Sequence, residues 1–219
     1  MSVNPIDLTT VANVKAWAGV TTAGDDQVIQ DAITAFSLYV MHITGRGNAD
    51  GSVPAASPFS GVVSYDEFYD GNGNDTLPLR NWPIVSVAAV IDTGVTIQAS
   101  TSTTSPGYVI DQSKKFLVLR FGGNQYGYTR NLRGGLTSGK GWSLGTMNIE
   151  VQYSAGFAAI PFDLEMMARK VVSLNYKRRQ RIDQKSQAMA QGAGTVSFYD
   201  WEMDESDKRV MIYYQARVA

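Results

Sequence analysis

The only histidine in this 219-residue chain, His42, limits the chemistry that a histidine could support. A serine or cysteine triad needs a histidine base that a carboxylate orients. His42 lies in a helical pattern with no carboxylate at helical reach, so we interpret it as an ordinary helix residue. The chain also lacks cysteine, which excludes the usual zinc ligand sets.

Two glycine-rich stretches approach known ligand motifs without completing them. Residues 134–141, GGLTSGKG, match a phosphate loop except at the last position, where Gly141 replaces the required hydroxyl. A strand pattern follows, whereas phosphate binding needs the N-terminus of a helix. Residues 70–75, DGNGND, lack the glutamate that closes a calcium loop. We predict a flexible loop at the first stretch and a hairpin turn at the second.

Carboxylates are numerous, but their spacing gives no catalytic pair. Neighbouring acids such as Asp66-Glu67 and Asp204-Glu205 point apart along the chain and cannot flank one scissile bond. A magnesium or calcium site made of carboxylates alone, or a small hydrolase built on such a site, stays open as an alternative. The prediction is a protein that is not an enzyme and that binds no cofactor or metal.

One dense basic run ends a helical pattern near the C-terminus. It consists of Lys177, Arg178, Arg179 and Arg181. Cations complement the negative end of a helix, and a solvated face is their usual role. The alternative is contact with DNA phosphates or with an acidic partner. The formal net charge of −1 excludes a protein that coats nucleic acid in bulk.

The C-terminal region gathers aromatic and apolar side chains behind a segment of small polar residues, 184–195. That segment has the composition of a flexible linker. The apolar residues that follow are Phe198, Tyr199, Trp201 and Met203, then Val210, Met211, Tyr213 and Tyr214 within a helical pattern at 207–217. So much apolar surface either packs inside the chain or docks on a partner, and both alternatives are open.

Helical patterns at both ends of the chain must position these residues. The longest covers residues 25–46, where apolar side chains recur at the spacing of one helix face. The stripe consists of Val28, Ile29, Ala32, Ile33, Phe36, Tyr39, Val40 and Ile43. Thr9 or Thr10 can cap a shorter helix at 8–18. The short connection at 20–24 predicts that these two helices form a hairpin.

Residue types that begin and end helices mark the remaining boundaries. Gly19 and Gly45 suit the left-handed position that closes a helix. Pro161 suits the first turn of a third helix, where a missing amide costs nothing. Asp204 or Ser206 can cap the last helix.

The middle of the chain predicts strands instead of helices. Strand patterns occur at 65–69, 76–79, 84–98, 108–111, 116–121 and 147–153. The Asn72-Gly73 pair predicts a turn that joins the first two strands as a hairpin. Residues 46–64 have no periodicity and predict an exposed, mobile loop. Strands this closely spaced favour antiparallel pairing.

The fold class predicted is α+β, an antiparallel helical bundle scaffold with a long inserted antiparallel β region. The expected domains are an N-terminal helical hairpin at 1–46, a β-rich insertion at 47–160, and C-terminal helices with the aromatic tail at 161–219. The first and last parts are expected to form one bundle. The start of the sequence has no signal-peptide pattern, and no apolar window predicts a transmembrane helix.

Four segments, in this order, resemble the head–tail connector proteins of long-tailed bacteriophages, also called adaptor or head-completion proteins. They are LTTVANVKAWAG, DDQVIQDAITAFSLYVMHITGR, EFYDGNGNDTLPLRNWPIVSV and IPFDLEMMARKVVSLNYKRR. The family shows a leucine-threonine start, a helix ending in threonine-glycine-arginine, a hairpin followed by tryptophan-proline, and a proline–acid–leucine helix ending in basic residues. The match covers about half the chain, and residues 94–147 are longer than in small family members.

The resemblance implies a structural virion protein located in the neck, between portal and tail, after synthesis in the host cytoplasm. Such proteins form a ring of copies, commonly a dodecamer, under the portal. The ring extends the DNA channel and provides the docking surface for the next neck or tail protein. The C-terminal segment that commonly engages the portal corresponds here to Phe198, Trp201, Met203 and residues 210–214. Double-stranded DNA is a possible passing contact, and no membrane is implied.

Two other readings stay open. In the first, the β region is a carbohydrate- or surface-binding module whose aromatic residues hold sugar rings. Those residues are Trp82, Tyr126, Tyr128 and Trp142. In the second, the chain is a stopper or tail-terminator ring, which differs from an adaptor in its neighbours and not in its chemistry.

Overall fold

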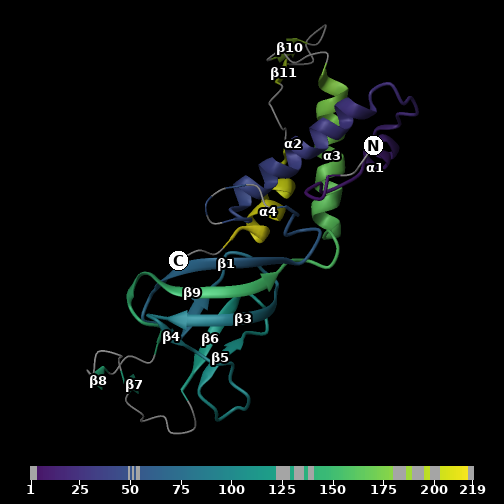
Figure 1. The fold of residues 1–219 in the computed structure, drawn as a ribbon. Helices are drawn as coiled ribbons and strands as arrows, with labels where there is room; N and C mark the ends of the chain where they lie inside the picture. Colours follow the sequence, from purple (N-terminus) through teal and green to yellow (C-terminus); the bar gives the residue numbers. More distant parts are fainter. Residues whose placement is uncertain are drawn as a thin grey trace.

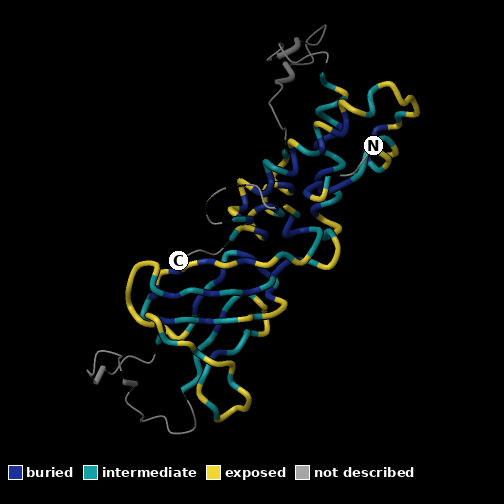
Figure 2. The backbone as a smooth tube through the Cα atoms, viewed as in Figure 1, coloured by how far each residue is buried: buried dark blue, intermediate teal, exposed yellow. Residues whose placement is uncertain are grey.

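A computed structural model of the chain shows a mixed α+β fold, as predicted, in which a helical part and a β part lie end to end (Figure 1). The structure describes residues 4–48, 50, 52, 55–121, 129–130, 136–137, 141–179, 186–188, 195–197 and 203–216. Buried residues gather inside the helical part and alternate with exposed residues along the strands (Figure 2). Within these residues, no helix combines the length and the hydropathy needed to cross a bilayer.

The helical part contains α1 (Val11–Ala18), α2 (Asp26–Thr44), α3 (Phe162–Arg178) and α4 (Glu205–Tyr214). Their ends follow the predicted chemistry. The Thr10 hydroxyl accepts a hydrogen bond from the Asn13 amide at 3.3 Å, which caps α1. Gly19 and Gly45 close α1 and α2 with φ angles of 70° and 64°. Asp204 caps α4 by accepting from the Asp207 amide at 2.9 Å.

The buried stripe of α2 is narrower than the sequence predicts. Its fully covered apolar residues are Ile29, Ile33, Phe36 and Val40. Val28 and Ile43, predicted to belong to the stripe, are 49% and 42% exposed. Ser37 and Thr44 are buried instead, because their hydroxyls donate to carbonyl oxygens one turn earlier, at 2.8 and 2.7 Å. Polar residues that satisfy their own donors can therefore take core positions that a hydrophobic pattern misses.

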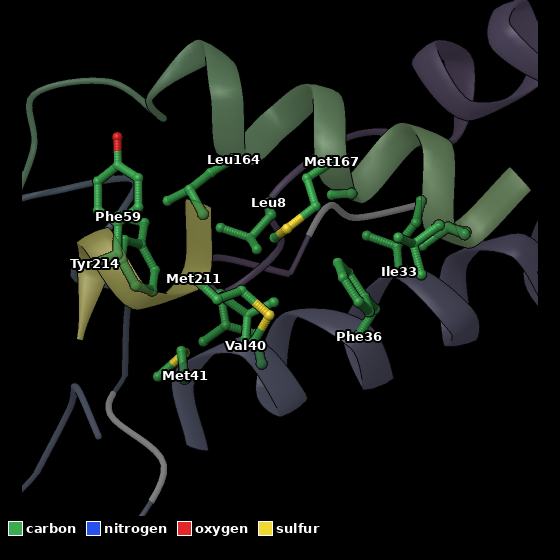
Figure 3. Packing of buried hydrophobic residues seen from close by; sticks show 14 of the residues in the cluster. Leu8, Ile33, Phe36, Val40, Met41, Phe59, Leu164, Met167, Met211 and Tyr214 are labelled. Carbon is green, nitrogen blue, oxygen red and sulfur yellow. The ribbon is translucent and has the colours of Figure 1, made fainter. Parts of the chain in front are cut away.

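One hydrophobic core joins all four helices to the N-terminal segment and to the long connection after α2. Figure 3 shows side chains from α2, α3 and α4 pointing toward Leu8. The connection at 46–64 was predicted to be exposed and mobile, and that prediction is wrong at 46–47 and 57–59, which are buried, and at 63–64, which belong to β1. Phe59 is fully buried, and its ring lies 6.5 Å from Phe157 and 5.9 Å from Tyr214, centroid to centroid. A segment without periodicity can still supply a core residue when tertiary contacts surround it.

The larger sheet of the β part is antiparallel, with strand order β1-β9-β3-β4. Its strands are β1 (Val63–Gly71), β9 (Gly145–Ala155), β3 (Ile84–Asp92) and β4 (Val95–Thr96). β9 confirms the strand predicted at 147–153. It lies between β1 and β3, and its residues alternate between the core and the outer face. The region predicted as one strand at 84–98 turns back at Thr93-Gly94, where both φ angles are positive.

The second sheet has strand order β2-β6-β5 and packs its apolar residues against those of the first. Its strands are β2 (Thr76–Pro78), β6 (Phe116–Arg120) and β5 (Gly107–Ile110). The predicted hairpin between the first two strands is wrong: β1 pairs with β9, and β2 pairs with β6. The turn exists, with Gly73 at a φ of 75°, but it carries the chain from one sheet to the other. Turn residues specify a reversal of the chain and not the strand that will be paired.

Two short antiparallel ribbons complete the described strands. One pairs β7 (Thr129–Arg130) with β8 (Leu136–Thr137), and the other pairs β10 (Ser186–Ala188) with β11 (Thr195–Ser197). β10 and the first residue of β11 fall within residues 184–195, which were predicted to be a flexible linker. Six residues in and beside this segment form a paired ribbon, a strand structure that its small polar composition did not predict.

Removing the Phe59 ring tests the buried connection. Phe59→Ala is expected to lower the free energy of unfolding by about 3–5 kcal/mol, because it leaves a cavity in the helical core. Val62→Ala is the matched control, since Val62 is 51% exposed, and it is expected to change stability by less than about 0.5 kcal/mol. Denaturant unfolding followed by circular dichroism measures both. Equal effects of the two substitutions would contradict the burial of Phe59.

Candidate partner-docking site

The predicted docking residues divide into three groups. Phe198, Tyr199 and Trp201 lie outside the described residues. Four others pack against or within the helical core: Met203, Val210, Met211 and Tyr214. Tyr213 is 62% exposed. One face of α4 therefore packs inside the chain, which is the first of the two alternatives predicted, and its other face is open to solvent.

Contacts at both ends hold α4 against the rest of the helical part. The Lys170 ammonium group on α3 contacts the carboxylates of Asp204 and Asp207, the latter at 3.0 Å. At the other end, the Tyr214 hydroxyl donates to Asp163 Oδ1 at 2.9 Å. Just after α4, the Ala216 amide donates to the carbonyl oxygen of Thr44, at the end of α2, at 2.7 Å. α4 is thus a fixed platform for the residues on its outer face.

The outer face of α4 combines apolar and basic side chains. Ile212 and Tyr213, neighbours at the C-terminal end of the helix, are 63% and 62% exposed. Lys208 and Arg209 are exposed one turn earlier. Phe162, at the start of α3, is 70% exposed and directly precedes the carboxylate that binds Tyr214. Large apolar residues this exposed are typical of surfaces that contact another molecule.

The junction of the helical part and the β part contains a buried cation, Arg46, which is 4% exposed. Its guanidinium carbon is 4.8 Å from the ring centroid of Phe59, 4.5 Å from Trp82 and 5.4 Å from Phe157. We call these three rings the cage. None of the three guanidinium nitrogens has a hydrogen-bond partner, and no salt bridge to Arg46 occurs among the described residues. Attraction to the ring faces is therefore its main compensation.

The cage extends to the surface through a second layer of rings. Tyr214 stacks on Trp82 at 5.8 Å with an interplanar angle of 7°, and Tyr213 meets the same indole edge-on at 5.9 Å. The Lys115 ammonium group lies 3.9 Å from the Trp82 ring centroid and 4.9 Å from that of Tyr213. Tyr213 is consequently both an exposed docking candidate and part of the wall around a buried charge.

Burial lowers the pKa of Arg46 to about 10, and the neighbouring tyrosines Tyr65, Tyr153 and Tyr214 act in the opposite direction. The group is still charged at neutral pH. Because its pKa is lowered on folding, its charge is a cost to the folded state below about pH 10, of about 3 kcal/mol. Its position just after the C-terminal end of α2 offsets part of this cost, since that end carries partial negative charge.

A buried acid lies on the sheet side of the same junction. The carboxylate of Glu67, 4% exposed, accepts hydrogen bonds from the hydroxyls of Tyr69 at 2.5 Å and Tyr153 at 2.6 Å. Burial, the largest cause, and the nearby carboxylate raise the pKa of both hydroxyls far above the ordinary tyrosine value. Both therefore stay protonated and act as donors. Arg80 Nε lies 3.6 Å from the other carboxylate oxygen.

Hydrogen bonds connect this acid to the residue that follows Arg46. The Asn81 amide donates to the Tyr153 hydroxyl at 3.2 Å. The Asn81 side chain then bonds the amide and the carbonyl oxygen of Gly47, both at 3.0 Å. A continuous polar connection thus runs from β1 and β9 to the end of α2. These bonds hold Asn81 and Gly47 against the strands, although Glu67 Oε1 and Arg80 Nε have no hydrogen-bond partner among the described residues.

The basic run is divided between an internal role and the surface. The Arg179 guanidinium lies 2.8 Å from Asp25 Oδ2 and 4.4 Å from the Tyr176 ring centroid. The hydrogen bond from Arg179, with a second from Tyr176, lowers the pKa of Asp25. Arg179 therefore joins the end of α3 to the start of α2. Lys177 is exposed and Arg178 half-buried, while Arg181 lies outside the described residues.

The residues proposed for sugar binding are not available as a set. Trp82 is 4% and Trp142 1% exposed, so neither indole face is open to a sugar ring. The Trp142 backbone amide donates to the carbonyl oxygen of Asn74 at 2.8 Å, which ties this residue to the turn between the two sheets. Tyr126 and Tyr128 lie outside the described residues. His42 is exposed on α2, and no cluster of three or more acidic or histidine side chains in the described ranges could hold a metal ion.

Sequence reasoning did not single out the cage or the Glu67 network as sites. Arg46 and Trp82 belong to the quoted threonine-glycine-arginine and tryptophan-proline motifs, so a signal existed. It could not show that the two residues touch, because 36 positions separate them. Glu67 gave no signal, since the strand pattern around it predicts an exposed acid as readily as a buried one.

Comparisons with known proteins give structural likenesses only. No protein-family model and no curated protein matches the chain. Two solved chains are similar to it at 13% sequence identity. One, from the "neck of native GTA particle computed with C12 symmetry", has a TM-score of 0.47 and matches over 100% of this chain and 94% of its own length. The other, from the "neck of empty GTA particle computed with C6 symmetry", has a TM-score of 0.45 over 100% and 95%. Values this low establish neither a family nor a function.

Arg46 variants test the balance between the buried charge and the rings. Arg46→Met is expected to keep the free energy of unfolding at or above the wild-type value at neutral pH, because it fills the cage without a charge. Arg46→Ala, which empties the cage, is expected to lower it by about 3 kcal/mol. Urea unfolding measures both. If Arg46→Met were as damaging as Arg46→Ala, the ring contacts would outweigh the cost of burying the charge.

Acid should weaken the attachment of α4. The Lys170 ammonium group, foremost among several donors, holds the pKa of Asp204 well below its usual 3.8. A lowered carboxyl pKa stabilises the fold above pH 3.8, and that contribution is lost as the pH falls below this value. Lys170→Met is expected to lower the melting temperature at neutral pH, and this effect should shrink progressively as the pH falls below 3.8. Lys208→Met, which breaks only an exposed pair, is the control and should change little at either pH.

Proposed function

We propose that this chain is a structural protein of the neck of a tailed bacteriophage-like particle, a head–tail adaptor that forms a ring under the portal. The observation that supports this most is the meeting of separate family motifs in one contact. The threonine-glycine-arginine end of α2 supplies Arg46, and the tryptophan-proline motif supplies Trp82, which covers its guanidinium at 4.5 Å. Motifs that share a buried contact depend on one another, and chance matches to generic turns and caps would have no reason to meet.

The architecture suits a passive connecting role. The helical part and the β part each have their own core, and the cage and the Glu67 network join them. A rigid body of two joined parts can contact one neighbour at each end. In this proposal it extends the DNA channel and provides the docking surface for the next neck or tail protein. A stopper or tail-terminator ring is the related alternative.

The outer face of α4 is the proposed contact with the portal. Ile212 and Tyr213 provide exposed apolar area on a helix that is fixed at both ends. The sequence adds Phe198, Tyr199, Trp201 and Met203 immediately before this helix. Large apolar side chains surrounded by polar ones dominate binding energy at many interfaces. Repetition around a ring multiplies a modest contact into a stable attachment. Lys177 and Arg178 are proposed to face DNA or an acidic partner.

A complementation experiment tests this function. In cells producing the particles, loss of the protein is expected to leave filled or leaking heads without tails. Wild-type protein should restore tailed particles, whereas Ile212→Asp combined with Tyr213→Asp should not, because charges would replace the apolar contact. Val28→Asp combined with Ile43→Asp places the same charge on exposed apolar sites of α2 and should restore them. Normal tailed particles in the absence of the protein would disprove the proposed role.

A further inference from the structure

The outer face of the larger sheet presents an acidic surface around one exposed ring. On β1, residues Ser64, Asp66, Phe68 and Asp70 are exposed and alternate with buried neighbours. Phe68, 52% exposed, lies between two carboxylates on its own strand and opposite Glu150 of β9. The four strands of this sheet contain no lysine or arginine. The surface therefore has apolar area and negative charge, but no cation of its own.

The carboxylates of this face are only partly compensated. The side-chain amide of Gln152 lies 3.0 Å from Glu150 Oε1 and 3.4 Å from Asp66 Oδ2, so one neutral donor serves two acids. Asp70 accepts from the Met147 amide at 2.6 Å. None of the three acids forms a salt bridge within the described ranges. A cationic partner could form ion pairs with all three carboxylates.

The chain carries matching positive charge in another segment. Residues 47–79 contain only acids among their charged residues: Asp50, Asp66, Glu67, Asp70 and Asp75. Residues 112–149 contain only bases: Lys114, Lys115, Arg120, Arg130, Arg133 and Lys140. Lys114 is exposed in the turn between β5 and β6. Charges of opposite sign are thus grouped in separate segments of the sequence, although Asp111 shares the turn of Lys114 and the whole chain is close to neutral.

Arg120 lies on the other side of the β part from the acidic face. On β6, Leu117 and Leu119 pack in the core between the two sheets. Arg120 alternates with them along the strand, so it points away from that core. Phe68 alternates with core residues of β1 and points away on the opposite side. One copy therefore cannot bring its own two surfaces together.

We propose that the acidic outer face of the larger sheet binds the basic side of the β part of a second copy of this chain. Asp66, Asp70 and Glu150 face Lys114 and Arg120 of the neighbour, and Phe68 supplies apolar contact at the centre. The surfaces differ, so each bound copy keeps one of each kind free. Such a heterologous contact continues from copy to copy and closes into a ring if the rotation permits.

This inference deepens the proposed ring but can be tested without the virus. Charge reversal on either surface should block self-association: Asp66→Lys with Asp70→Lys makes both sides basic, and Lys114→Glu with Arg120→Glu makes both acidic. Mixing the two variants should restore association, in alternating order, because each then meets its complement. Sedimentation velocity of the full chain measures assembly size. Self-association of each variant is expected to weaken by more than about tenfold.

The control is Asp31→Lys with Asp50→Lys, which changes the net charge as much as Asp66→Lys with Asp70→Lys does, at exposed positions on α2 and in the connection after it. It should associate as the wild type does, and all variants should keep wild-type melting temperatures. Added salt should weaken wild-type association, since exposed charges are screened. Undiminished association of either charge-reversed variant, failure of the mixture to associate, or a wild-type protein that stays monomeric would overturn the proposal. Loss of the virion role with complementary association intact would overturn only the proposed function.

Discussion

The buried guanidinium of Arg46 is the constraint on which the architecture depends. A cation 4% exposed, without a carboxylate or a hydrogen-bond partner among the described residues, requires another source of compensation. The faces of Phe59, Trp82 and Phe157 provide it, and they come from the connection after α2, the connection before β3 and the segment after β9. The Arg46 side chain therefore contacts rings from three distant segments at the point where the helical part meets the β part.

The same junction explains how one chain can serve two sets of contacts. Tyr65 is close enough to both charges that Arg46 lowers and Glu67 raises its pKa, which burial, the largest cause, raises to about 12. A buried base and a buried acid thus lie on either side of the boundary between the two cores. Because Arg46, Tyr65 and Glu67 are buried at the junction, partners can contact only the surfaces away from it. The outer face of α4 is apolar and basic, and the outer face of the larger sheet is apolar and acidic.

Several residues that look alike in the sequence differ in burial, and therefore in role. Tyr213 and Tyr214 are neighbours, yet one is 62% exposed and the other 5%. Arg178 and Arg179 belong to one basic run, but Arg179 joins two helices through Asp25. The tryptophans considered for sugar binding lie inside the two cores instead. In each case the sequence shows the chemistry of the side chain, but it does not show whether that side chain points to solvent or into the core.

The sequence by itself determined the α+β class, the helix boundaries and most strands, because these follow from local periodicity, capping and turn chemistry. Thr10, Gly19, Gly45 and Asp204 act within a few residues of their partners, so they could be predicted. Only the tertiary structure decided that β1 pairs with β9, that Phe59 is buried, and that Arg46 reaches Trp82. These contacts join residues far apart in the chain, and their free energy depends on surroundings that no local pattern contains.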